Sequence, residues 1–425
     1  MSDTSSACPP AGTVLGDLTM AQLRATVCWA AGSRELAPVC ERWLRSAGDG
    51  VREGARRVRP GDLAALPQMT REQAMEAARH RLRGRPGHYL VSSGTTGVRA
   101  VRALTGRDAF TPGSLGDWRP LRPGDVLLNC LPAGGAYLHT ERLADLCGVH
   151  TVTAPTDLTA LARIAGELRE IGVNAVAGLP HTLAVLAEDL LAHGNPLPLR
   201  TVLWTGEHLS PGCRAALREL NPRVELWGTY SASETGAVAA AFPGCPPGVL
   251  HLWPGQVLEL SARGCLLTRA AAPGAARPLL RTALDDRLAA ARCTCSRVWP
   301  AVRVLGRAGH TVRLRGAELP VDGLRLAAAD SAEVTGAQLL AVPADPARPH
   351  GPLSRLGLRV QPRPGGAAGP GGAEARAAAR VLARHPRLRA VAARHPDAFF
   401  AEAAPLALLS YGKVRPVVVV AGAAG

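Results

Sequence analysis

The spacing of hydrophobic residues changes along the chain and predicts different kinds of structure. Residues 20–47 (MAQLRATVCWAAGSRELAPVCERWLRSA) and 70–84 (TREQAMEAARHRLRG) carry apolar positions three and four apart, which is typical of amphipathic helices. From about residue 88, short apolar runs such as DVLLNCL (125–131) and RTVLWTGE (200–207) alternate with helical stretches such as HTLAVLAEDLLAHG (181–194). This alternation predicts an α/β domain with a largely parallel sheet.

The last part of the chain has a different pattern. After about residue 250 it becomes rich in strands, and a boundary is expected near VLGRAGHTVRLRG (304–316). We therefore expect an α/β protein with a large N-terminal domain of mixed and parallel sheets and helices, followed by a small mobile α+β lid domain. In this division, residues 1–85 are the helical N-terminal part of the large domain, residues 86–306 are its core, and residues 307–425 are the lid.

Composition excludes some classes of protein. The 425 residues are 47% hydrophobic and 20% charged, which fits a folded globular protein. The net charge of +15 would suit nucleic acid, but the arginines stand singly along predicted helices, with no basic block interleaved with aromatic residues. No signal-peptide pattern or run of about 18 apolar residues occurs, and ten cysteines are too few for a disulfide scaffold. We expect a cytoplasmic monomer or homodimer that binds neither nucleic acid nor membrane.

A short segment after a predicted strand has the composition of a phosphate-binding loop. In VSSGTTGVRA (91–100), glycines allow a tight turn and a close approach to phosphate, while hydroxyls and amides donate hydrogen bonds to its oxygens. It is not a Walker loop, because the Gly-Lys-Ser/Thr ending is absent. A polar turn without a ligand is the alternative interpretation. The candidate phosphate-binding residues are Ser92, Ser93, Gly94, Thr95, Thr96 and Gly97.

Lysine occurs once in the sequence. Of the 49 basic residues, 48 are arginine, and the one lysine is Lys413, between Gly412 and Val414. A compact ammonium on a flexible stem can bridge two oxyanions at one point, whereas a guanidinium is a wide planar fork. Its position therefore indicates either a catalytic cation or an ordinary surface lysine.

Five further segments, together with the loop at 91–100, resemble in their order the motifs of the adenylate-forming enzymes, the acyl-CoA synthetase and ligase superfamily. They are RTVLWTGEHLS (200–210), LWGTYSASETG (226–236), PLLRTALDD (278–286), GRAGHTVRLRG (306–316) and SYGKVR (410–415). Each segment alone could arise by chance, but the ordered series covers roughly residues 85–415. The resemblance implies an enzyme that uses ATP and Mg²⁺.

The resemblance also implies a role for each matching residue. The loop 92–97 would cradle the phosphates, Glu234 with the Ser233 hydroxyl would contact the metal, and Lys413 would touch both the acyl carboxylate and the α-phosphate. Glu234 and Lys413 are thus the implied catalytic residues. The remaining implied ATP and AMP contacts are Gly206, Glu207, Tyr230 (stacked on adenine), Asp286 (at the ribose hydroxyls) and Arg307.

Two cysteine-containing segments resemble the phenylacetate–CoA ligase branch of the superfamily. These are CPPGVLHLW (245–253) and CTCSRVWPAVRVLGR (293–307). In this context Cys245, His251, Cys293 and Cys295 offer three thiolates and one imidazole, a set suited to tetrahedral structural zinc. Without that context, the cysteines would be interpreted as small buried residues.

The sequence departs from the family pattern at several positions. Gly309 and His310 stand where family hinges usually carry acidic residues, so the charge contacts of the family hinge are not expected here. Asp285 and Ser231 replace glycines, but no departure removes a charge that the chemistry needs. Tyr137, His139 and Gly178 are the candidate residues of the acyl pocket.

The resemblance implies ATP-dependent activation of a small or aromatic carboxylic acid as an acyl-adenylate, with release of pyrophosphate. Transfer to CoA, as in an AMP-forming acid–thiol ligase, is the expected second step. Transfer to an amine, as in an amide synthetase, or to a carrier-protein thiol in secondary metabolism remains an alternative. A non-catalytic basic binding protein and a degenerate scaffold are more distant alternatives.

Overall fold

The computed structural model describes residues 13–32, 35–46, 55–70, 72–74, 76, 88–91, 101–104, 115–154, 159–232, 235–261, 264–270, 279–364, 371–409 and 412–420. The chain divides into two compact units, each assembled from segments that are separated in the sequence. Unit 1 comprises residues 1–122, 133–148 and 227–308, and unit 2 comprises residues 123–132, 149–226 and 309–425. The three consecutive parts drawn from the sequence stay a prediction.

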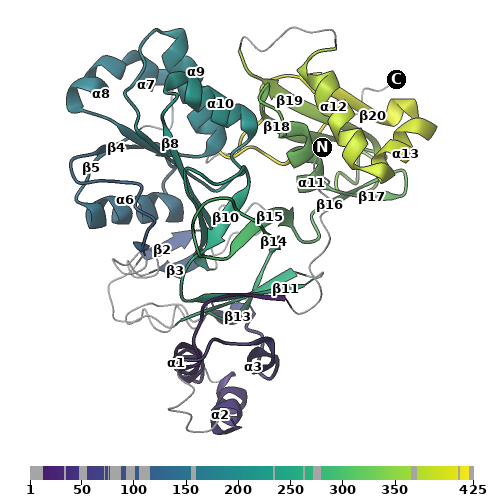
Figure 1. The fold of residues 1–425 in the computed structure, drawn as a ribbon. Coiled ribbons are helices and arrows are strands. Elements are labelled where there is room, and N and C mark those ends of the chain that lie inside the picture. Colours follow the sequence, from purple (N-terminus) through teal and green to yellow (C-terminus); the bar gives the residue numbers. More distant parts are fainter. Residues whose placement is uncertain are drawn as a thin grey trace. The chain divides into compact units, whose positions relative to one another are not determined.

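The N-terminal helices of unit 1 pack on a small antiparallel sheet. The Thr19 side chain and Gln22 form a capping box at the start of α1 (Met20–Ala30), which satisfies backbone groups that a helix end leaves open. Apolar residues of α1, α2 (Ala37–Ser46) and α3 (Pro60–Ala64) share a core with Val257 and Leu280 (Figure 1). The sheet has the order β1 (Thr13–Gly16), β11 (Gln256–Ser261), β12 (Gly264–Arg269) and β13 (Leu279–Leu284).

The other strands of unit 1 are also antiparallel. Their order is β14 (Asp286–Ala291), β15 (Ala301–Arg307), β10 (Val249–Leu252), β9 (Gly236–Ala241) and β8 (Glu225–Ala232). Unit 1 further contains α6 (Gly135–Cys147) and the hairpin of β2 (His88–Val91) and β3 (Val101–Leu104). The antiparallel register places residues 245–251 and 293–299 at neighbouring strand ends.

Unit 2 contains the parallel strands that the alternating pattern predicts. Their order is β7 (Thr201–Thr205), β6 (Ala175–Gly178), β4 (Val126–Asn129) and β5 (His150–Thr153). The connecting helices are α7 (Thr159–Arg163), α8 (Ala165–Ile171), α9 (Pro180–Ala192) and α10 (Pro211–Leu220). Every residue of β4, β6 and β7 is buried, which is why these strands are mostly apolar rather than alternating between apolar and polar positions. The predicted α/β class is confirmed.

Polar residues at the starts of these strands fix their alignment. Arg200 donates to Asp125, which precedes β4, and lies 3.0 Å from the carboxylate of Glu225. Asn174, before β6, donates to Asp125 at 3.1 Å and accepts from the backbone N–H of Val126 at 3.1 Å. The residues before β4, β6 and β7 are therefore joined to one another by hydrogen bonds.

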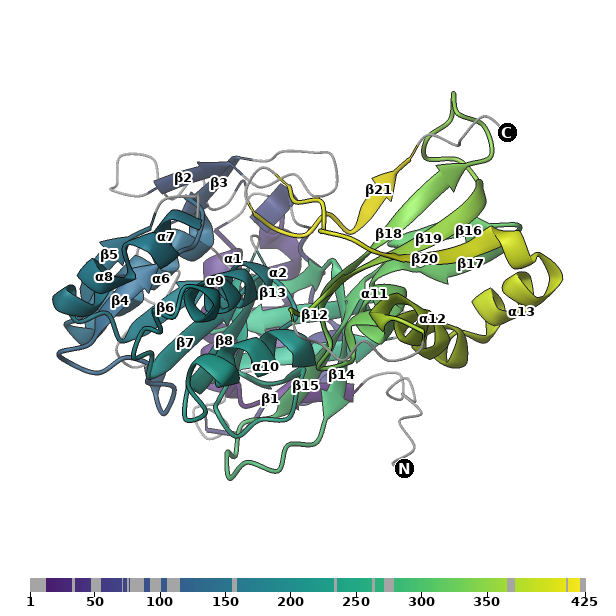
Figure 2. The same ribbon diagram turned by 90° about the horizontal axis from the view of Figure 1, so that it is seen from above.

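The C-terminal part of unit 2 is a second sheet with helices packed on it. Its order is β17 (Ala317–Pro320), β16 (Thr311–Leu314), β19 (Leu353–Pro362), β18 (Val334–Pro343) and β21 (Val417–Val419), with β20 (Phe399–Ala403) beside β19. The helices are α11 (Val321–Ala329), α12 (Ala373–Arg384) and α13 (Pro386–Arg394), followed by a 3₁₀ turn (Pro396–Ala398). Figure 2 shows these helices along this sheet, with which they share one hydrophobic core.

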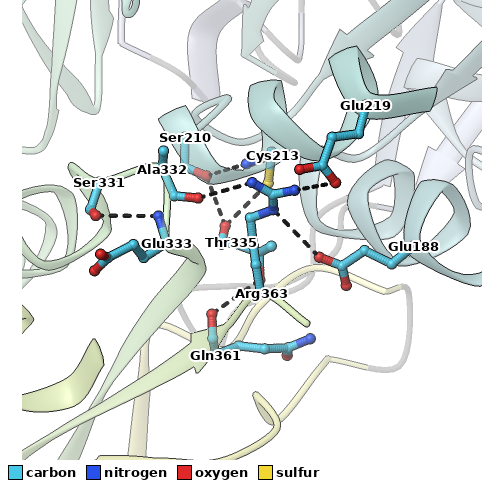
Figure 3. A network of polar contacts seen from close by, with 10 residues as sticks. All are labelled: Glu188, Ser210, Cys213, Glu219, Ser331, Ala332, Glu333, Thr335, Gln361 and Arg363. Carbon is cyan, nitrogen blue, oxygen red and sulfur yellow. Dashed lines mark hydrogen bonds and ion pairs between the residues drawn. The ribbon is translucent and has the colours of Figure 1, made fainter. Parts of the chain in front are cut away.

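Within unit 2, α10 lies directly against the start of β18. A Cβ atom on Gly212 would lie 2.1 Å from the backbone oxygen of Val334, so glycine is required for this approach. The Ser210 hydroxyl caps α10 by accepting from the Cys213 backbone N–H at 3.1 Å, and it donates to the Thr335 carbonyl at 2.9 Å. The Cys213 thiol lies 3.1 Å from the same carbonyl (Figure 3).

An arginine completes this contact between α9, α10 and the C-terminal sheet. Arg363 follows β19, and its guanidinium lies 2.6 Å from a carboxylate oxygen of Glu219 and 4.0 Å from Glu188 (Figure 3). It also donates to the Ala332 carbonyl at 3.3 Å. Burial raises the pKa of Glu188 to about 7, an effect that Arg363 opposes and that Asp189 and Glu219 reinforce.

Among the described residues, none of the helices combines the length and the apolar character needed to cross a lipid bilayer.

Candidate active site and metal centre

The predicted site residues fall into three groups. The loop residues Ser92 to Gly97, together with Ser233 and Glu234, lie outside the described residues. Tyr230, Asp286, Arg307 and the four candidate zinc ligands belong to unit 1, as do Tyr137 and His139. Gly178, Gly206, Glu207 and Lys413 belong to unit 2. Each group is therefore described within its own unit.

Three predicted nucleotide contacts lie near one another in unit 1. The Tyr230 hydroxyl, in β8, donates to the carboxylate of Asp286 at 2.7 Å. Asp286 opens β14, and its partner in the antiparallel register is Arg307, the last residue of β15. All three residues are partly buried. Three strands, β8, β14 and β15, thus bring a phenol, a carboxylate and a guanidinium near one another, a combination suited to hydroxyl groups and anions.

The departure at Asp285 is accommodated by the backbone. Its carbonyl accepts a hydrogen bond from the Ala308 backbone N–H at 2.7 Å, and the residue itself is exposed. Since the contact uses the main chain, an aspartate in place of the family's glycine leaves it intact.

In unit 2, the lysine lies over a glycine that follows a buried strand. Gly206 comes directly after β7 and has φ +80°, a conformation that side chains rarely adopt. A Cβ atom there would lie 3.0 Å from Cε and 3.3 Å from Nζ of Lys413, and 3.1 Å from Leu179. Glycine at 206 therefore leaves the space that the lysine side chain occupies.

A tight turn presents this lysine. Leu408 and Val414 form an antiparallel bridge, and the Leu409 backbone N–H donates to the Lys413 carbonyl at 2.8 Å. Gly412 has φ +83°, and its N–H donates to the Leu409 carbonyl at 2.8 Å. The Gly-Lys pair in the sequence thus supplies the left-handed residue of the turn and the cation next to it.

Glu207 contacts the same turn. Its carboxylate accepts a hydrogen bond from the Val414 backbone N–H at 2.9 Å. Burial raises the pKa of the Glu207 carboxyl, while Lys413, Arg325 and the Val414 hydrogen bond lower it, in that order of size. The Glu207 carboxylate therefore lies close to two cations and holds the backbone at Val414, where the chain leaves the turn.

The pocket candidates have different surroundings. A Cβ atom on Gly178, at the end of β6, would lie 2.9 Å from the Leu183 side chain, so this glycine permits the close start of α9. Tyr137 and His139 are partly buried residues of α6. Because they are two positions apart on a helix, their side chains leave it in different directions.

The four predicted zinc ligands converge in unit 1. One donor atom from each of Cys245, His251, Cys293 and Cys295 lies within 4.8 Å of all the others. The Cys295 sulfur is 3.1 Å from Nε2 of His251 and 3.3 Å from the Cys293 sulfur. Zinc–sulfur bonds of about 2.3 Å in a tetrahedron place two sulfurs about 3.8 Å apart, so the four donors fit such an ion.

The surroundings of His251 favour metal binding by Nε2. Its Nδ1 lies 2.7 Å from the Trp299 carbonyl, which only accepts, so Nδ1 carries the proton and Nε2 directs its lone pair toward the sulfurs. The Phe242 ring packs edge-on against the imidazole, and the Phe242 backbone N–H donates to the Cys245 sulfur at 3.5 Å. Burial raises the pKa of the Cys245 thiol to about 12.

Some contacts at these sites were not anticipated from the sequence. They include the Trp299 carbonyl, the Val414 N–H and Arg325 near Glu207. The first two are backbone groups, which any residue type could supply. Arg325 is one arginine among 48 and has no distinguishing neighbour in the sequence.

The comparisons with known proteins agree with this fold. Residues 87–258 match the AMP-binding enzyme family. A crystal structure of 2-hydroxyisobutyryl-CoA ligase, in the postadenylation state with R3-HIB-AMP, is similar with a TM-score of 0.62 and 15% identity, over 94% of this chain and 89% of that one. A search of curated proteins gives no significant match. The family match covers residues 87–258, and the structural similarity shows that the chain has the fold of such a ligase.

Two further similar structures are a CoA ligase and an amide bond synthetase. The anthranilate CoA ligase AuaEII, in complex with anthranoyl-AMP, has a TM-score of 0.52 and 14% identity, over 84% of this chain and 73% of that one. The amide bond synthetase McbA from Marinactinospora thermotolerans has a TM-score of 0.51 and 15% identity, over 77% and 66%. At these identities the likeness establishes the fold, and it leaves the acid and the acceptor open.

Proposed function

We propose that the chain joins a carboxylic acid to ATP and then transfers the acyl group to the thiol of CoA. In the first step a carboxylate oxygen attacks the α-phosphorus, and pyrophosphate leaves. In the second, the thiol sulfur attacks the acyl carbonyl carbon, its proton passes to solvent, and AMP leaves. The observation that carries the proposal is the position of the one lysine of the sequence, on a turn over Gly206.

The role of Lys413 follows from the charges of the first step. Two anions must approach each other, and negative charge develops on the oxygens around the α-phosphorus. An ammonium on a flexible stem can contact both the acyl carboxylate and the phosphate. When bound, Mg²⁺ neutralises phosphate charge, and the resemblance assigns its contact to Glu234 and Ser233 and the phosphate cradle to residues 92–97.

The unit 1 group would hold the nucleoside. Asp286 would accept hydrogen bonds from the ribose hydroxyls while Tyr230 orients its carboxylate. The Tyr230 ring would stack on adenine, and Arg307, across the strand pair, would support the ribose or phosphate side. For Gly206 and Glu207, which belong to unit 2, the family resemblance also implies ATP and AMP contacts.

The class of acid and the acceptor rest on similarity. The CoA ligases among the similar structures favour CoA and a small or aromatic acid. An amine acceptor is the second candidate, favoured by the similarity to an amide bond synthetase. A carrier-protein thiol in secondary metabolism remains the third. The cytoplasmic location, the monomeric or homodimeric state and the absence of a nucleic-acid partner stay parts of this proposal.

Zinc is proposed as a structural ion rather than a catalytic one. The four donor atoms lie within 4.8 Å of one another, and around a zinc ion they would complete a tetrahedral set with no position for water or substrate, as is typical of structural sites. The same cysteine-containing segments are the reason for assigning the chain to the phenylacetate–CoA ligase-like branch.

The test is pyrophosphate release with a panel of carboxylic acids, followed by addition of CoA, amines or a carrier protein. With an active acid, Lys413→Ala should lower the rate of adenylation about 10²–10³-fold, the usual cost of removing one group that stabilises transition-state charge. Arg415→Ala removes an exposed cation two residues away and should retain the rate.

Two results would overturn the proposal. Wild-type adenylation by Lys413→Ala would refute the role of the lysine. Salt-dependent retention on DNA, without pyrophosphate release from any acid, would favour a basic binding protein instead.

A further inference from the structure

Glu207 lies at the junction between the strand that ends at Gly206 and the turn that carries Lys413. Its carboxylate accepts the Val414 N–H at 2.9 Å, one residue beyond the lysine. The preceding residue, Gly206, is the one over which the lysine side chain lies. Two consecutive residues of one segment therefore contact two consecutive residues of the other.

The charges around Glu207 favour the same arrangement. Lys413 and Arg325 are the two cations that act on its carboxylate. Arg325 is itself fixed, because its Nε donates to the Ala337 carbonyl at 2.9 Å and its guanidinium lies 3.4 Å from Asp322. The position of Arg325 is thus set by α11 and β18, whereas Lys413 lies on a turn.

The backbone contact limits where the lysine can lie. Val414 is buried, and the hydrogen bond from its N–H to Glu207 fixes the chain immediately after Lys413. Leu179 packs near both Gly206 and Gly412, since a Cβ atom on either would lie 3.1 or 3.6 Å from it. With one end of the turn fixed and its glycine packed, few positions remain for the lysine side chain.

We propose that Glu207 is a positioning residue for Lys413, whose carboxylate holds the turn so that the ammonium lies over Gly206. This inference rests on the proposed adenylation, in which Lys413 is the catalytic cation. It gives the Glu207 side chain a task different from the nucleotide contact implied by the family resemblance. Its effect on the reaction is indirect, through the place and the order of the lysine.

Three substitutions separate the two contacts of Glu207. Glu207→Gln keeps an oxygen that can accept from Val414 but removes the charge. Glu207→Asp keeps the charge but shortens the reach, and Glu207→Ala removes both. We expect kcat for pyrophosphate release to fall about 10-fold for Glu207→Gln and about 100-fold for Glu207→Ala, with the KM for ATP changed less than about 3-fold. Glu170→Gln, at an exposed position on α8, is the matched control.

A second measurement does not depend on catalysis. Because Lys413 is the one lysine of the sequence, an amine-reactive ester modifies a single side chain, and peptide mass spectrometry gives its rate relative to the N-terminal amine. Loss of the contact should speed the labelling of Lys413 at least about 3-fold in Glu207→Ala, because the ammonium loses both its counter-charge and its fixed place. Glu170→Gln should label at the wild-type rate.

The outcomes distinguish the inference from the proposed function. Unchanged labelling in Glu207→Ala overturns the inference, and so does a raised KM for ATP with unchanged kcat, which would indicate a nucleotide contact. Wild-type adenylation by Lys413→Ala overturns the proposed role of the lysine but leaves the labelling result valid. Because Glu207→Gln is nearly isosteric, a wild-type melting temperature for that variant shows that lost activity does not reflect misfolding.

Discussion

The cysteine–histidine cluster of unit 1 and the lysine turn of unit 2 each join segments that are far apart in the sequence, and they do so differently. In the cluster, four side chains from residues 245–251 and 293–295 bring their donor atoms within 4.8 Å of one another. At the turn, one carboxylate accepts one backbone N–H, and a lysine lies over a glycine.

The cysteine–histidine cluster and the lysine turn differ in the free energy that would have to be overcome to separate their segments. A structural zinc ion contributes on the order of 10 kcal/mol to the fold of a small domain, whereas one hydrogen bond contributes about 1 kcal/mol. The cluster is therefore suited to a permanent link. Under the proposed function, the turn would suit a cation that engages one step of the reaction and then withdraws to admit an acceptor.

The largest expected effect is at the cluster. We expect one zinc ion per purified chain, measured by elemental mass spectrometry. Cys295→Ser should lose the ion and lower the melting temperature by at least about 10 °C, the effect of losing only part of the stabilisation that such an ion gives. Chelation of the wild-type protein should have the same effect.

Cys28→Ser is the control for the cluster, because Cys28 is an exposed cysteine of the same unit, outside the four-ligand set. It should keep both the zinc content and the melting temperature. If the wild-type protein keeps its melting temperature without the metal, the cluster is not a zinc-dependent link. It would then not differ in this way from the lysine turn.

The next effect concerns the packing that supports the turn. A methyl group on Gly212 would lie 2.1 Å from the Val334 oxygen, and neither backbone can yield cheaply. Gly212→Ala should therefore lower the free energy of unfolding by about 3 kcal/mol, measured by urea denaturation. It should also speed the labelling of Lys413, because β18 pairs with β21, which follows the turn.

Gly166→Ala is the matched control, because no heavy atom lies within 4 Å of its added methyl group on α8. Alanine favours a helix by up to about 1 kcal/mol over glycine, so this variant should be slightly more stable than the wild type. Equal effects of the two substitutions would show that α10 does not depend on the close approach to β18.

The predictions that the structure supports were made from residue types and from their spacing over short stretches of sequence. The mostly apolar segments 126–129, 175–178 and 201–205 are buried parallel strands, because burial on both faces favours apolar residues at successive positions. The donor atoms of the four zinc-ligand candidates lie within 4.8 Å of one another, and their role as zinc ligands stays a prediction that depends on the family resemblance.

Contacts made by backbone atoms could not be predicted in this way. The partner of Glu207 is the N–H of Val414, and the neighbour of Gly212 is the oxygen of Val334. Neither depends on the identity of the partner residue. Such contacts follow only from the three-dimensional arrangement of segments that are more than a hundred positions apart in the sequence.

The smallest expected effect concerns the pH dependence of the contact between α9, α10 and the C-terminal sheet. The pKa of Glu188 is about 7 in the folded protein, against about 4.5 when the chain is unfolded. Folding therefore retains a proton that the unfolded chain has lost. This group costs no stability below about pH 4.5, and its cost grows as the pH rises to about 7 and is complete above it.

Glu188→Gln removes that dependence. We expect its free energy of unfolding, relative to the wild type, to be about 2 kcal/mol higher at pH 8 than at pH 5, measured by urea denaturation. Glu219→Gln removes a charge from the same Arg363 at a position 59% exposed, and should cost less than about 1 kcal/mol at either pH. If Glu188→Gln is instead less stable than the wild type at pH 8, the ion pair with Arg363 outweighs burial. That result would show that the contact between α9, α10 and the C-terminal sheet is stabilised by the ion pair rather than by the close packing at Gly212.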